Sequence, residues 1–256
     1  MKNPPTAYEN IPFLRSDPCR PVRLQLEYLY PQEVMKENRI NSTIVLFGSA
    51  RIPSPEKAGL CKNSKLAELM PFYEEARKLA YIVSSTCQTN HDREYVIITG
   101  GGGGIMEAGN RGAYEAGRKS ISLNITLPHE QDPNPYVTEE LCFRFHYFSM
   151  RKMHFLLRAK AVCIFPGGFG TFDELFEALT LIQTGKITPM PVILFGSEHW
   201  KRVVDWNYMA ETGLIGPNDL DLLTFCDTAE EAWAAVGKFY ASVNQTGQKP
   251  DAHPEG

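Results

Sequence analysis

The sequence lacks the long apolar runs and the charge excess that mark several classes of protein. No apolar run approaches the roughly 20 residues that a membrane-spanning helix needs. The stretch from Met1 to Phe13 contains prolines and has no apolar core of the kind found in signal peptides. The formal net charge is −4, so the composition indicates no basic surface for nucleic acid or a membrane. We therefore predict a cytoplasmic protein with no nucleic-acid or membrane partner.

Cysteine and histidine are sparse and scattered. The six cysteines form no CxxC pair, and Cys163 lies inside an apolar run, which favours reduced thiols over disulfides. The six histidines show no metal-ligand spacing with cysteines or acids. We therefore expect no structural or catalytic metal.

Apolar runs of strand length alternate with stretches of helical periodicity. The expected strands are 43–47, 95–99, 120–127, 141–148, 161–165, 191–195 and 223–225. The expected helices are 21–38, 64–84 with a kink or break at Pro71, 105–114, 150–160, 172–182 closed by Gly185, and 228–243. This order predicts an α/β fold: a doubly wound, Rossmann-like parallel sheet with helices on both faces.

The composition divides the chain into three parts. Residues 1–40 are expected to form a proline-rich arm and a helix, 41–245 a single Rossmann-like nucleotide-binding catalytic domain, and 246–256 a C-terminal tail. The apolar residues of the helix at 21–38 are available to cover the sheet or a second subunit.

Glycine-bearing turns follow three of the expected strands. They are Gly48-Ser49, Gly100 to Gly104, and Gly167 to Thr171. Because ligands of parallel sheets bind beyond the carboxyl ends of the strands, all three turns should meet at one rim. A tight packing turn accounts for one or two glycines but not for the five from Gly100 to Gly104, so we predict a nucleotide or sugar-phosphate site.

The third of these turns leads directly from a strand into a helix. Its glycines, Gly167, Gly168 and Gly170, let the backbone approach a ligand, and the helix N-terminus offers free N–H groups to an anion. Thr171 adds a hydroxyl at the same place. No GKS or GKT follows, which excludes a Walker P-loop, and the single Gly48 after the first strand fits the dinucleotide fingerprint poorly.

Two cations lie close to this rim in the sequence. Arg151 and Lys152 fall in the first turn of a helix that Ser149 is expected to cap, where positive charges oppose the helix dipole. A solvated surface pair is the alternative interpretation. Their place beside a phosphate turn favours a function.

The acid Glu174 also has two interpretations. Thr171-x-x-Glu174 has the spacing of a capping box, in which the glutamate binds the backbone of the helix start. Alternatively, Glu174 is a functional acid beside the phosphate turn. Asp173 is its rival for that role, and Glu177 is expected to be solvated.

Together these motifs resemble those of the LONELY GUY (LOG) family, whose members are often mislabelled lysine decarboxylases. Residues 166–174, PGGFGTFDE, are similar to the family's PGGxGTxxE signature, and Arg151-Lys152 resembles its arginine–lysine pair. Gly48-Ser49-Ala50 matches the family's first-strand turn. Residues 100–106 resemble its glycine loop but are one residue tighter. The resemblance runs from about Thr43 to Gly196.

The resemblance implies a phosphoribohydrolase, in which water cleaves the N-glycosidic bond of a nucleoside 5′-monophosphate to give free base and ribose 5-phosphate. Cytokinin riboside monophosphates, as in cytokinin biosynthesis, or AMP, as in an AMP nucleosidase, are the implied substrates, and no cofactor is needed. The implied catalytic pair is Arg151 and Glu174. The expected substrate-binding residues, including a Glu130 that resembles a family substrate-binding glutamate, are Gly48, Ser49, Gly101, Gly102, Gly103, Glu130, Lys152, Gly167, Gly168, Gly170, Thr171 and Asp173.

Two further expectations follow from the resemblance. A non-catalytic nucleotide or molybdopterin carrier is the alternative function, since related folds bind such ligands without turnover. We expect a homodimer or a higher homo-oligomer, because the family's sites lie near subunit contacts. A pyridoxal-dependent decarboxylase would require a Schiff-base lysine, and the sequence singles none out.

Overall fold

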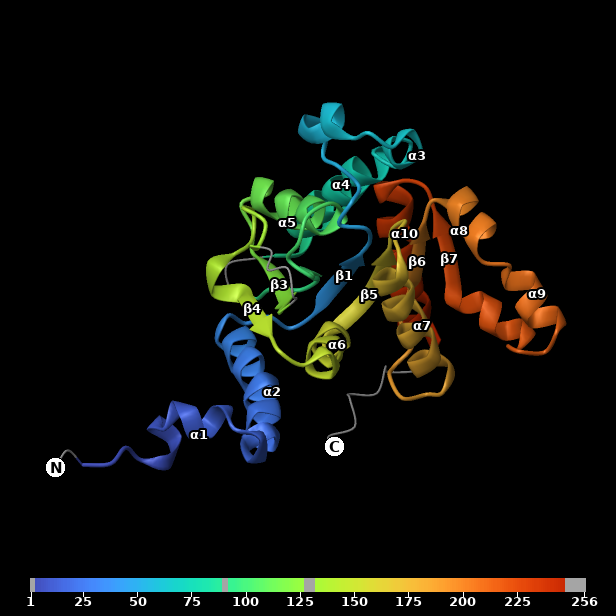
Figure 1. Ribbon diagram of the computed structural model, residues 1–256. Coiled ribbons are helices and arrows are strands. Elements are labelled where there is room, and N and C mark those ends of the chain that lie inside the picture. Colours follow the sequence, from blue (N-terminus) through green and yellow to red (C-terminus); the bar gives the residue numbers. More distant parts are fainter. Residues whose placement is uncertain (1–2, 89–91, 127–131, 247–256) are drawn as a thin grey trace.

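The computed structural model describes residues 3–88, 92–126 and 132–246. Within them a seven-stranded sheet has the order β4-β3-β2-β1-β5-β6-β7, and all neighbouring strands are parallel (Figure 1). The strands are β1 Thr43–Phe47, β2 Val96–Thr99, β3 Ser120–Ile125, β4 Cys142–Phe145, β5 Ala159–Ile164, β6 Val192–Phe195 and β7 Leu223–Cys226. The chain builds outward from β1 to β4 and then returns to β5 beside β1, which makes these two strands the topological switch point. The predicted fold class is confirmed.

Helices cover both faces of the sheet. The α-helices are α1 Ile11–Arg15, α2 Arg20–Glu37, α3 Ser64–Ala67, α4 Pro71–Cys87, α5 Ile105–Glu115, α6 Phe148–Leu156, α7 Phe169–Gln183, α8 Ser197–Val203, α9 Trp206–Glu211 and α10 Ala229–Thr246. The 3₁₀ helices are η1 Ala7–Glu9, η2 Asp17–Cys19, η3 Pro55–Leu60, η4 Glu139–Leu141 and η5 Pro217–Leu222. No helix in the described part of the chain is long and apolar enough to cross a membrane.

The alternation of side chains along the strands divides the core into two layers. Ile44 and Leu46 of β1 pack with α4, α5 and α10, whereas Val45 and Phe47 pack with α2, α6, α7, α8 and α9. Figure 1 shows α6 and α7 on one side of the sheet and α4, α5 and α10 on the other. Burial on both faces explains why the strands are continuous apolar runs in the sequence.

Most strand boundaries follow the apolar runs, and β4 is the main exception. It ends at Phe145, three residues before the predicted end, because Phe148 already begins α6. Strand β3 ends at Ile125, so the predicted extension to Thr126 is wrong, and Leu127 lies outside the described residues. Pro71 occupies the first position of α4 and separates it from α3, so the predicted break occurs there.

The N-terminus of α6 is capped by a residue far away in the sequence. Helix α6 begins at Phe148, so the prediction that Ser149 is its cap is wrong. The carboxylate of Glu27 in α2 instead accepts hydrogen bonds from the backbone N–H groups of His146 (2.7 Å) and Tyr147 (3.1 Å). A carboxylate at this position satisfies free N–H groups and is favoured by the helix dipole. These bonds tie α2 to the residues that lead into α6.

The N-terminal arm lies against α2 and projects from the body of the protein (Figure 1). The guanidinium of Arg23 in α2 donates to the carbonyl oxygens of Leu14 (2.8 Å) and Ser16 (2.6 Å), which ties α1 to α2. Met35 of α2 belongs to the core of the sheet. The division of the chain at residues 40 and 245 stays a prediction.

Candidate functional site

A cavity of about 800 Å³ opens where β1, β2 and β5 end. Its lining includes Gly48 to Ala50 after β1, Gly100 after β2, and Pro166 to Thr171 after β5, so the three glycine turns meet at one rim. Arg151 of α6 and Glu174 of α7 line the same cavity. Its size lies within the range of roughly 300–1,000 Å³ that is usual for small-molecule sites.

The turn after β1 connects the other two glycine turns. The backbone N–H of Ser49 donates to the carbonyl oxygen of Pro166 (3.0 Å), and the carbonyl oxygen of Ser49 accepts from Ile105 (3.2 Å). A Cβ atom on Gly48 would lie 2.7 Å from the Ile105 side chain, so the close approach of α5 requires glycine there. Ser49 therefore holds the turn after β5 and the start of α5 at a fixed separation.

Most of the five-glycine run is explained by contacts within the protein. A Cβ on Gly100 would lie 2.5 Å from Nη2 of Arg151, and one on Gly102 would lie 2.8 Å from the Met106 side chain. Gly101 and Gly104 have φ angles of +74° and +62°, which favour glycine. Glycine is therefore needed at four of the five positions, either because a neighbouring side chain leaves no room for a Cβ or because φ is positive. The expectation that packing cannot account for these glycines is wrong.

The loop formed by Gly101 to Gly103 is not part of the described cavity lining. Its carbonyl oxygens are bound by Asn134, whose backbone N–H donates to Gly101 (2.9 Å) and whose Nδ2 donates to Gly102 (3.0 Å). Among the glycines of this run, only Gly100 belongs to the described lining of the cavity. The proposed roles of Gly101, Gly102 and Gly103 in substrate binding therefore gain no support from their position.

The phosphate-type turn after β5 has a different character. Gly168 caps α7 without a side-chain hydrogen bond, and Phe169 is the first helical residue. A Cβ atom on Gly168 or Gly170 would meet nothing within 4 Å, so no protein contact requires glycine at either position. A Cβ on Gly167, by contrast, would lie 2.0 Å from the Thr171 hydroxyl oxygen. The turn thus leaves open space in front of the free N–H groups at the start of α7.

Glu174 is a buried acid and not a cap. Thr171 is the third residue of α7, so it cannot serve as the N-cap of a capping box, and that interpretation is wrong. The Glu174 residue is 8% exposed and has no hydrogen-bond partner among the described residues. Burial raises the pKa of its carboxyl to about 7; nearby Lys152 and Arg151 lower it, whereas Glu177 and Asp173 raise it further.

The guanidinium of Arg151 is fixed by contacts on several sides. Its Nε donates to the carbonyl oxygen of Leu123 at the end of β3 (2.7 Å), and its Cζ lies 5.1 Å from the centre of the Phe155 ring. Burial lowers the pKa of Arg151, and the charge of Glu174 partly offsets this effect. Arginine still remains protonated, so the cavity contains a fixed positive charge.

Lys152 points away from the cavity toward α7. Its Nζ forms ion pairs with Asp173 (2.8 Å) and Glu177 (3.1 Å). Burial alone would lower the pKa of Lys152, but the hydrogen bonds that it donates to these two acids raise it. Glu177, expected to be solvated, is half-buried, and Asp173 lines both the cavity and a neighbouring groove that contains Lys152. The structure therefore separates the arginine–lysine pair, since only Arg151 lines the described cavity.

Several residues that line the cavity were not predicted from the sequence. They are Arg51, Leu66, Leu69, Phe148 and His199. Arg51 follows the Gly48-Ser49-Ala50 turn directly, and that position could have identified it. The others come from α3, from the residues after it, and from α6 and α8, so only the fold brings them together. Burial lowers the pKa of the His199 ring, which favours its neutral form.

Two other expectations concern residues that bind substrate or metal. Glu130, the predicted substrate-binding glutamate, lies outside the described residues. Within 3–88, 92–126 and 132–246, no group of three or more His, Cys, Asp or Glu side chains is arranged to hold a metal ion.

The chain is similar to a known protein family and to a curated enzyme. A family model described as "Possible lysine decarboxylase" matches residues 106–236, just over half of the chain. A curated relative, the pyrimidine/purine nucleotide 5′-monophosphate nucleosidase of Escherichia coli strain K12, is 33% identical over 126 residues. This match covers 44% of the chain and 27% of the relative, so the chain spans about a quarter of the relative's length.

Solved structures of similar fold include molybdenum cofactor proteins. The molybdenum cofactor binding protein of Rippkaea orientalis is 16% identical, with a TM-score of 0.51, over 78% of this chain and 98% of that chain. The molybdenum cofactor carrier protein of Chlamydomonas reinhardtii is 19% identical, with a TM-score of 0.52, over 78% of this chain and 99% of that chain. At these identities the likeness concerns the fold alone.

The burial of Glu174 leads to a prediction about stability. Because its pKa rises from 4.5 to about 7 on folding, the protonated carboxyl favours the folded state below pH 4.5, and this contribution is lost as the pH rises through about 7. We expect Glu174→Gln to raise the free energy of unfolding at pH 8 by up to about 3 kcal/mol, and by much less at pH 5. Urea unfolding at both pH values measures the difference. The control is Asp173→Asn, because the Asp173 side chain is 60% exposed and should give no such pH-dependent gain. An equal gain for Glu174→Gln at the two pH values would contradict the prediction.

Proposed function

The chain belongs to the LOG-type family described as possible lysine decarboxylases, and from this premise we propose that it is a nucleoside 5′-monophosphate phosphoribohydrolase. The proposed reaction is hydrolysis of the N-glycosidic bond of AMP or a cytokinin riboside monophosphate, giving free base and ribose 5-phosphate. The observation that carries this proposal is a buried, unpaired Glu174 that shares one cavity with Arg151 and an open helix N-terminus. The nucleosidase named among the relatives supports the same reaction class.

The open turn at the start of α7 is the proposed binding site of the 5′-phosphate. Gly168 and Gly170 leave room for the anion, and the free N–H groups and the helix dipole attract it. Thr171 is buried at the same turn, with its hydroxyl against Gly167. Binding energy from the phosphate then positions the glycosidic bond at the reacting groups.

Glu174 is the proposed catalytic acid–base group. Cleavage of an N-glycosidic bond passes through an oxocarbenium-like state, which a nearby carboxylate stabilises or whose attacking water it orients. With a pKa of about 7, a large fraction of Glu174 is ionised at neutral pH. An ionised carboxylate can accept the proton that the attacking water loses, and the same group in its acid form can donate a proton.

Arg151 is proposed to act through its charge. Since arginine is a poor proton donor, it stabilises negative charge on the phosphate or on the departing base. Its contacts with Leu123 and Phe155 hold the guanidinium in place before substrate arrives. A group that is already oriented needs no reorganisation during the reaction.

The residues present do not fit pyridoxal phosphate chemistry. That chemistry needs a lysine to form a Schiff base with the cofactor, and no lysine lines the described part of the cavity. The nearest candidate in sequence, Lys152, is held by Asp173 and Glu177.

A non-catalytic nucleotide or molybdopterin carrier remains the alternative, suggested by the fold relatives. The raised pKa of Glu174 favours the enzyme, because a carrier of an anionic ligand has no need of a buried acid.

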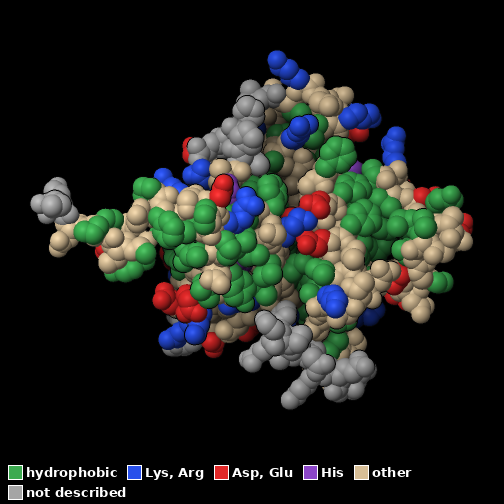
Figure 2. Space-filling model, turned by 60° about the horizontal axis from the view of Figure 1, so that its bottom comes forward, with side chains coloured by type: hydrophobic (Ala, Val, Ile, Leu, Met, Phe, Trp, Pro, Cys, Tyr) green, Lys and Arg blue, Asp and Glu red, His purple; other side chains and the backbone are tan. Residues whose placement is uncertain are grey.

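We also propose that the protein forms a homodimer or a higher homo-oligomer. Helix α2 exposes Leu26 (52%), Leu29 (51%) and Tyr30 (65%), and Phe169 beside the cavity is 97% exposed. Figure 2 views the protein from the side where α2 and the arm lie and shows hydrophobic side chains gathered in patches on this surface. Burial of such patches against a second copy would remove apolar area from water.

The reaction itself gives the first test. Purified protein without added metal should release adenine and ribose 5-phosphate from AMP, with kcat/KM rising as the pH increases through about 7 as Glu174 ionises. Glu174→Gln and Arg151→Met should each reduce kcat by roughly 10² or more while the protein stays folded. Chromatography of the products measures turnover.

The outcomes of this test separate the two functions. Tight binding of AMP with no product after hours would favour the carrier. A larger loss of activity in Asp173→Asn than in Glu174→Gln would show that Asp173 is the principal acid.

The phosphate turn makes a separate prediction. Gly170→Ala fills the open space in front of α7, so we expect the KM for AMP to rise at least roughly tenfold, since one charge-assisted contact contributes about 1.5–3 kcal/mol. Adenosine should already be a very poor substrate and should be little affected. Gly237→Ala in α10 is the matched control, because a Cβ there also meets nothing within 4 Å. Both variants should stay as stable as the wild type or gain about 1 kcal/mol. Equal efficiency on AMP and adenosine in the wild type would show that the turn does not bind phosphate.

The proposed assembly is tested by size-exclusion chromatography with light scattering. We expect the wild type to have at least twice the mass of one chain. Leu26→Glu combined with Leu29→Glu places two charges on the exposed face of α2 and should shift the protein toward the monomer if α2 forms the contact. A monomeric wild type at micromolar concentration would contradict the proposal.

A further inference from the structure

Arg51 is a cation that lines the cavity and has no role in the proposed mechanism. It follows the Gly48-Ser49-Ala50 turn, and its backbone N–H donates to the Ser49 hydroxyl (3.1 Å). The next residue, Ile52, is fully buried, whereas the Arg51 side chain is exposed. The backbone is therefore held at the cavity while the guanidinium remains free to turn.

Arg51 lies close to the phosphate-type turn. Ser49, two residues before it, donates its backbone N–H to the carbonyl oxygen of Pro166 at the start of that turn. Two residues of extended chain span at most about 7 Å, which an extended arginine side chain can also cover. Both Arg51 and the glycines at the start of α7 line the same cavity. A phosphate at α7 is therefore within reach of the Arg51 guanidinium.

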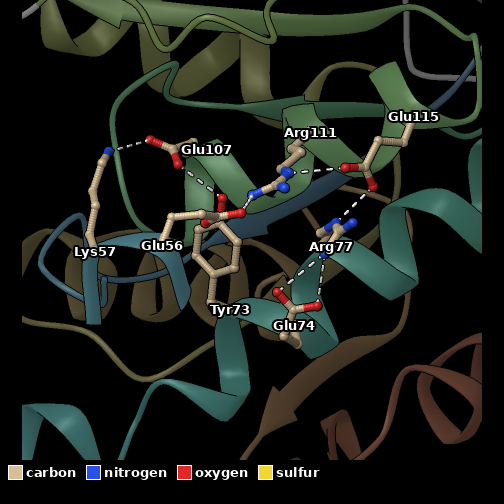
Figure 3. A network of polar contacts seen from close by, with 8 residues as sticks. All are labelled: Glu56, Lys57, Tyr73, Glu74, Arg77, Glu107, Arg111 and Glu115. Carbon is tan, nitrogen blue, oxygen red and sulfur yellow. Dashed lines mark hydrogen bonds and ion pairs between the residues drawn. The ribbon is translucent and has the colours of Figure 1, made fainter. Parts of the chain in front are cut away.

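The charges in the segment after Arg51 are already paired. The carboxylate of Glu56 in η3 binds Arg111 of α5 (2.8 Å), and Lys57 binds Glu107 of α5 (3.2 Å). Glu107 also accepts a hydrogen bond from the buried hydroxyl of Tyr73 (2.9 Å). Figure 3 shows that these contacts join η3 to α4 and α5 in one network.

This network has two consequences for Arg51. It fixes η3, and with it the chain that leaves the cavity, to α5. It also directs Glu56, the nearest acid in the sequence, toward Arg111. Among the described residues, the Arg51 side chain has no ion pair or hydrogen bond, although it lies at the edge of a built site.

The two arginines of the cavity differ in what they can do. Arg151 donates through Nε to the carbonyl oxygen of Leu123 and lies against the Phe155 ring, so its guanidinium acts from a fixed position in the cavity. Arg51 has its full donor set available. A phosphate monoester carries nearly two negative charges at neutral pH, and a guanidinium can bind two of its oxygens at once. The helix dipole supplies only about half a positive charge, so a mobile cation beside the helix start would strengthen the binding of a dianion.

We propose that Arg51 binds the 5′-phosphate of the substrate together with the start of α7 and thereby determines the preference for nucleoside monophosphates over free nucleosides. The inference rests on the proposed function for the identity of the ligand. It assigns Arg51 to binding and not to bond cleavage. The guanidinium turns inward when the phosphate enters and leaves with ribose 5-phosphate.

The test measures binding in the Glu174→Gln background, so that it does not depend on turnover. Isothermal titration calorimetry with AMP, adenosine and inorganic phosphate is compared for this protein and for the same protein carrying Arg51→Met. We expect the additional change to raise the Kd of AMP and of inorganic phosphate at least tenfold and to leave that of adenosine unchanged. Arg51→Lys should restore part of the affinity, because lysine supplies charge without the paired donors. In the wild-type background, Arg51→Met should raise KM for AMP with little change in kcat.

Arg202→Met, which removes an exposed arginine of α8 outside the cavity lining, is the matched control and should change none of these values. An unchanged Kd for AMP in Arg51→Met would overturn the proposal, as would an equal loss for AMP and adenosine, since the latter would assign Arg51 to the base. If AMP binds but is never hydrolysed, the proposed enzymatic function is wrong. The effect of Arg51 on the binding of AMP and phosphate is still measured in that case. If neither AMP nor inorganic phosphate binds, both proposals are wrong.

Discussion

The rest of the site depends on one constraint, which is that the Glu174 carboxyl is buried without a hydrogen-bond partner among the described residues. A carboxyl that is 8% exposed and has no hydrogen-bond partner in the described structure resists ionisation, and its pKa rises to about 7. It is carried there by the packing of α7, because Leu175 and Ala178 lie on the same buried side of the helix. The apolar stripe that anchors α7 therefore also sets the position and the acidity of its acid.

The buried acid is balanced by a half-buried cation, Arg151, whose position depends on distant parts of the chain. Arg151 rests against Gly100, where even a methyl group would collide with it. Its helix, α6, starts where Glu27 of α2 binds the free N–H groups. Helix α2 precedes the residues 106–236 that match the family. The N-terminal segment thus supports the geometry of the site without lining the cavity.

The sequence predicted those features that arise from local patterns. Strands buried on both faces are continuous apolar runs, and parallel topology brings the turns that follow β1, β2 and β5 to one rim, so the cavity at this rim and the position of Glu174 beside it could be predicted. The cap of α6 could not, because Glu27 lies 119 residues before His146. The position of Lys152 depends on its contacts with α7, which the spacing of Arg151 and Lys152 does not reveal.

The glycines show most clearly where sequence reasoning reaches its limit. In the sequence, a run of five glycines suggests a ligand more strongly than three separated glycines do. The structure indicates the opposite, because the stronger indication of a ligand is at the turn after β5. Gly100 is required by Arg151 and Gly104 by a left-handed turn, so a ligand is not needed to explain them. At Gly168 and Gly170 nothing in the protein requires the missing side chain.

A glycine that no protein contact requires carries more information about a ligand than one that packing already explains. Gly168 and Gly170 make the unfolded chain more flexible than residues with a side chain would, and this disfavours folding. The folded protein gains no packing contact from them that would offset this cost. The same reasoning applies to the charges. Arg151 is fixed by Leu123 and so costs little to orient when a ligand binds, whereas an unpaired Arg51 must lose side-chain freedom. In the proposed function, preorganised charge from Arg151 acts at the reacting bond and adaptable charge from Arg51 acts on the phosphate, a combination that would bind a dianion and still release it.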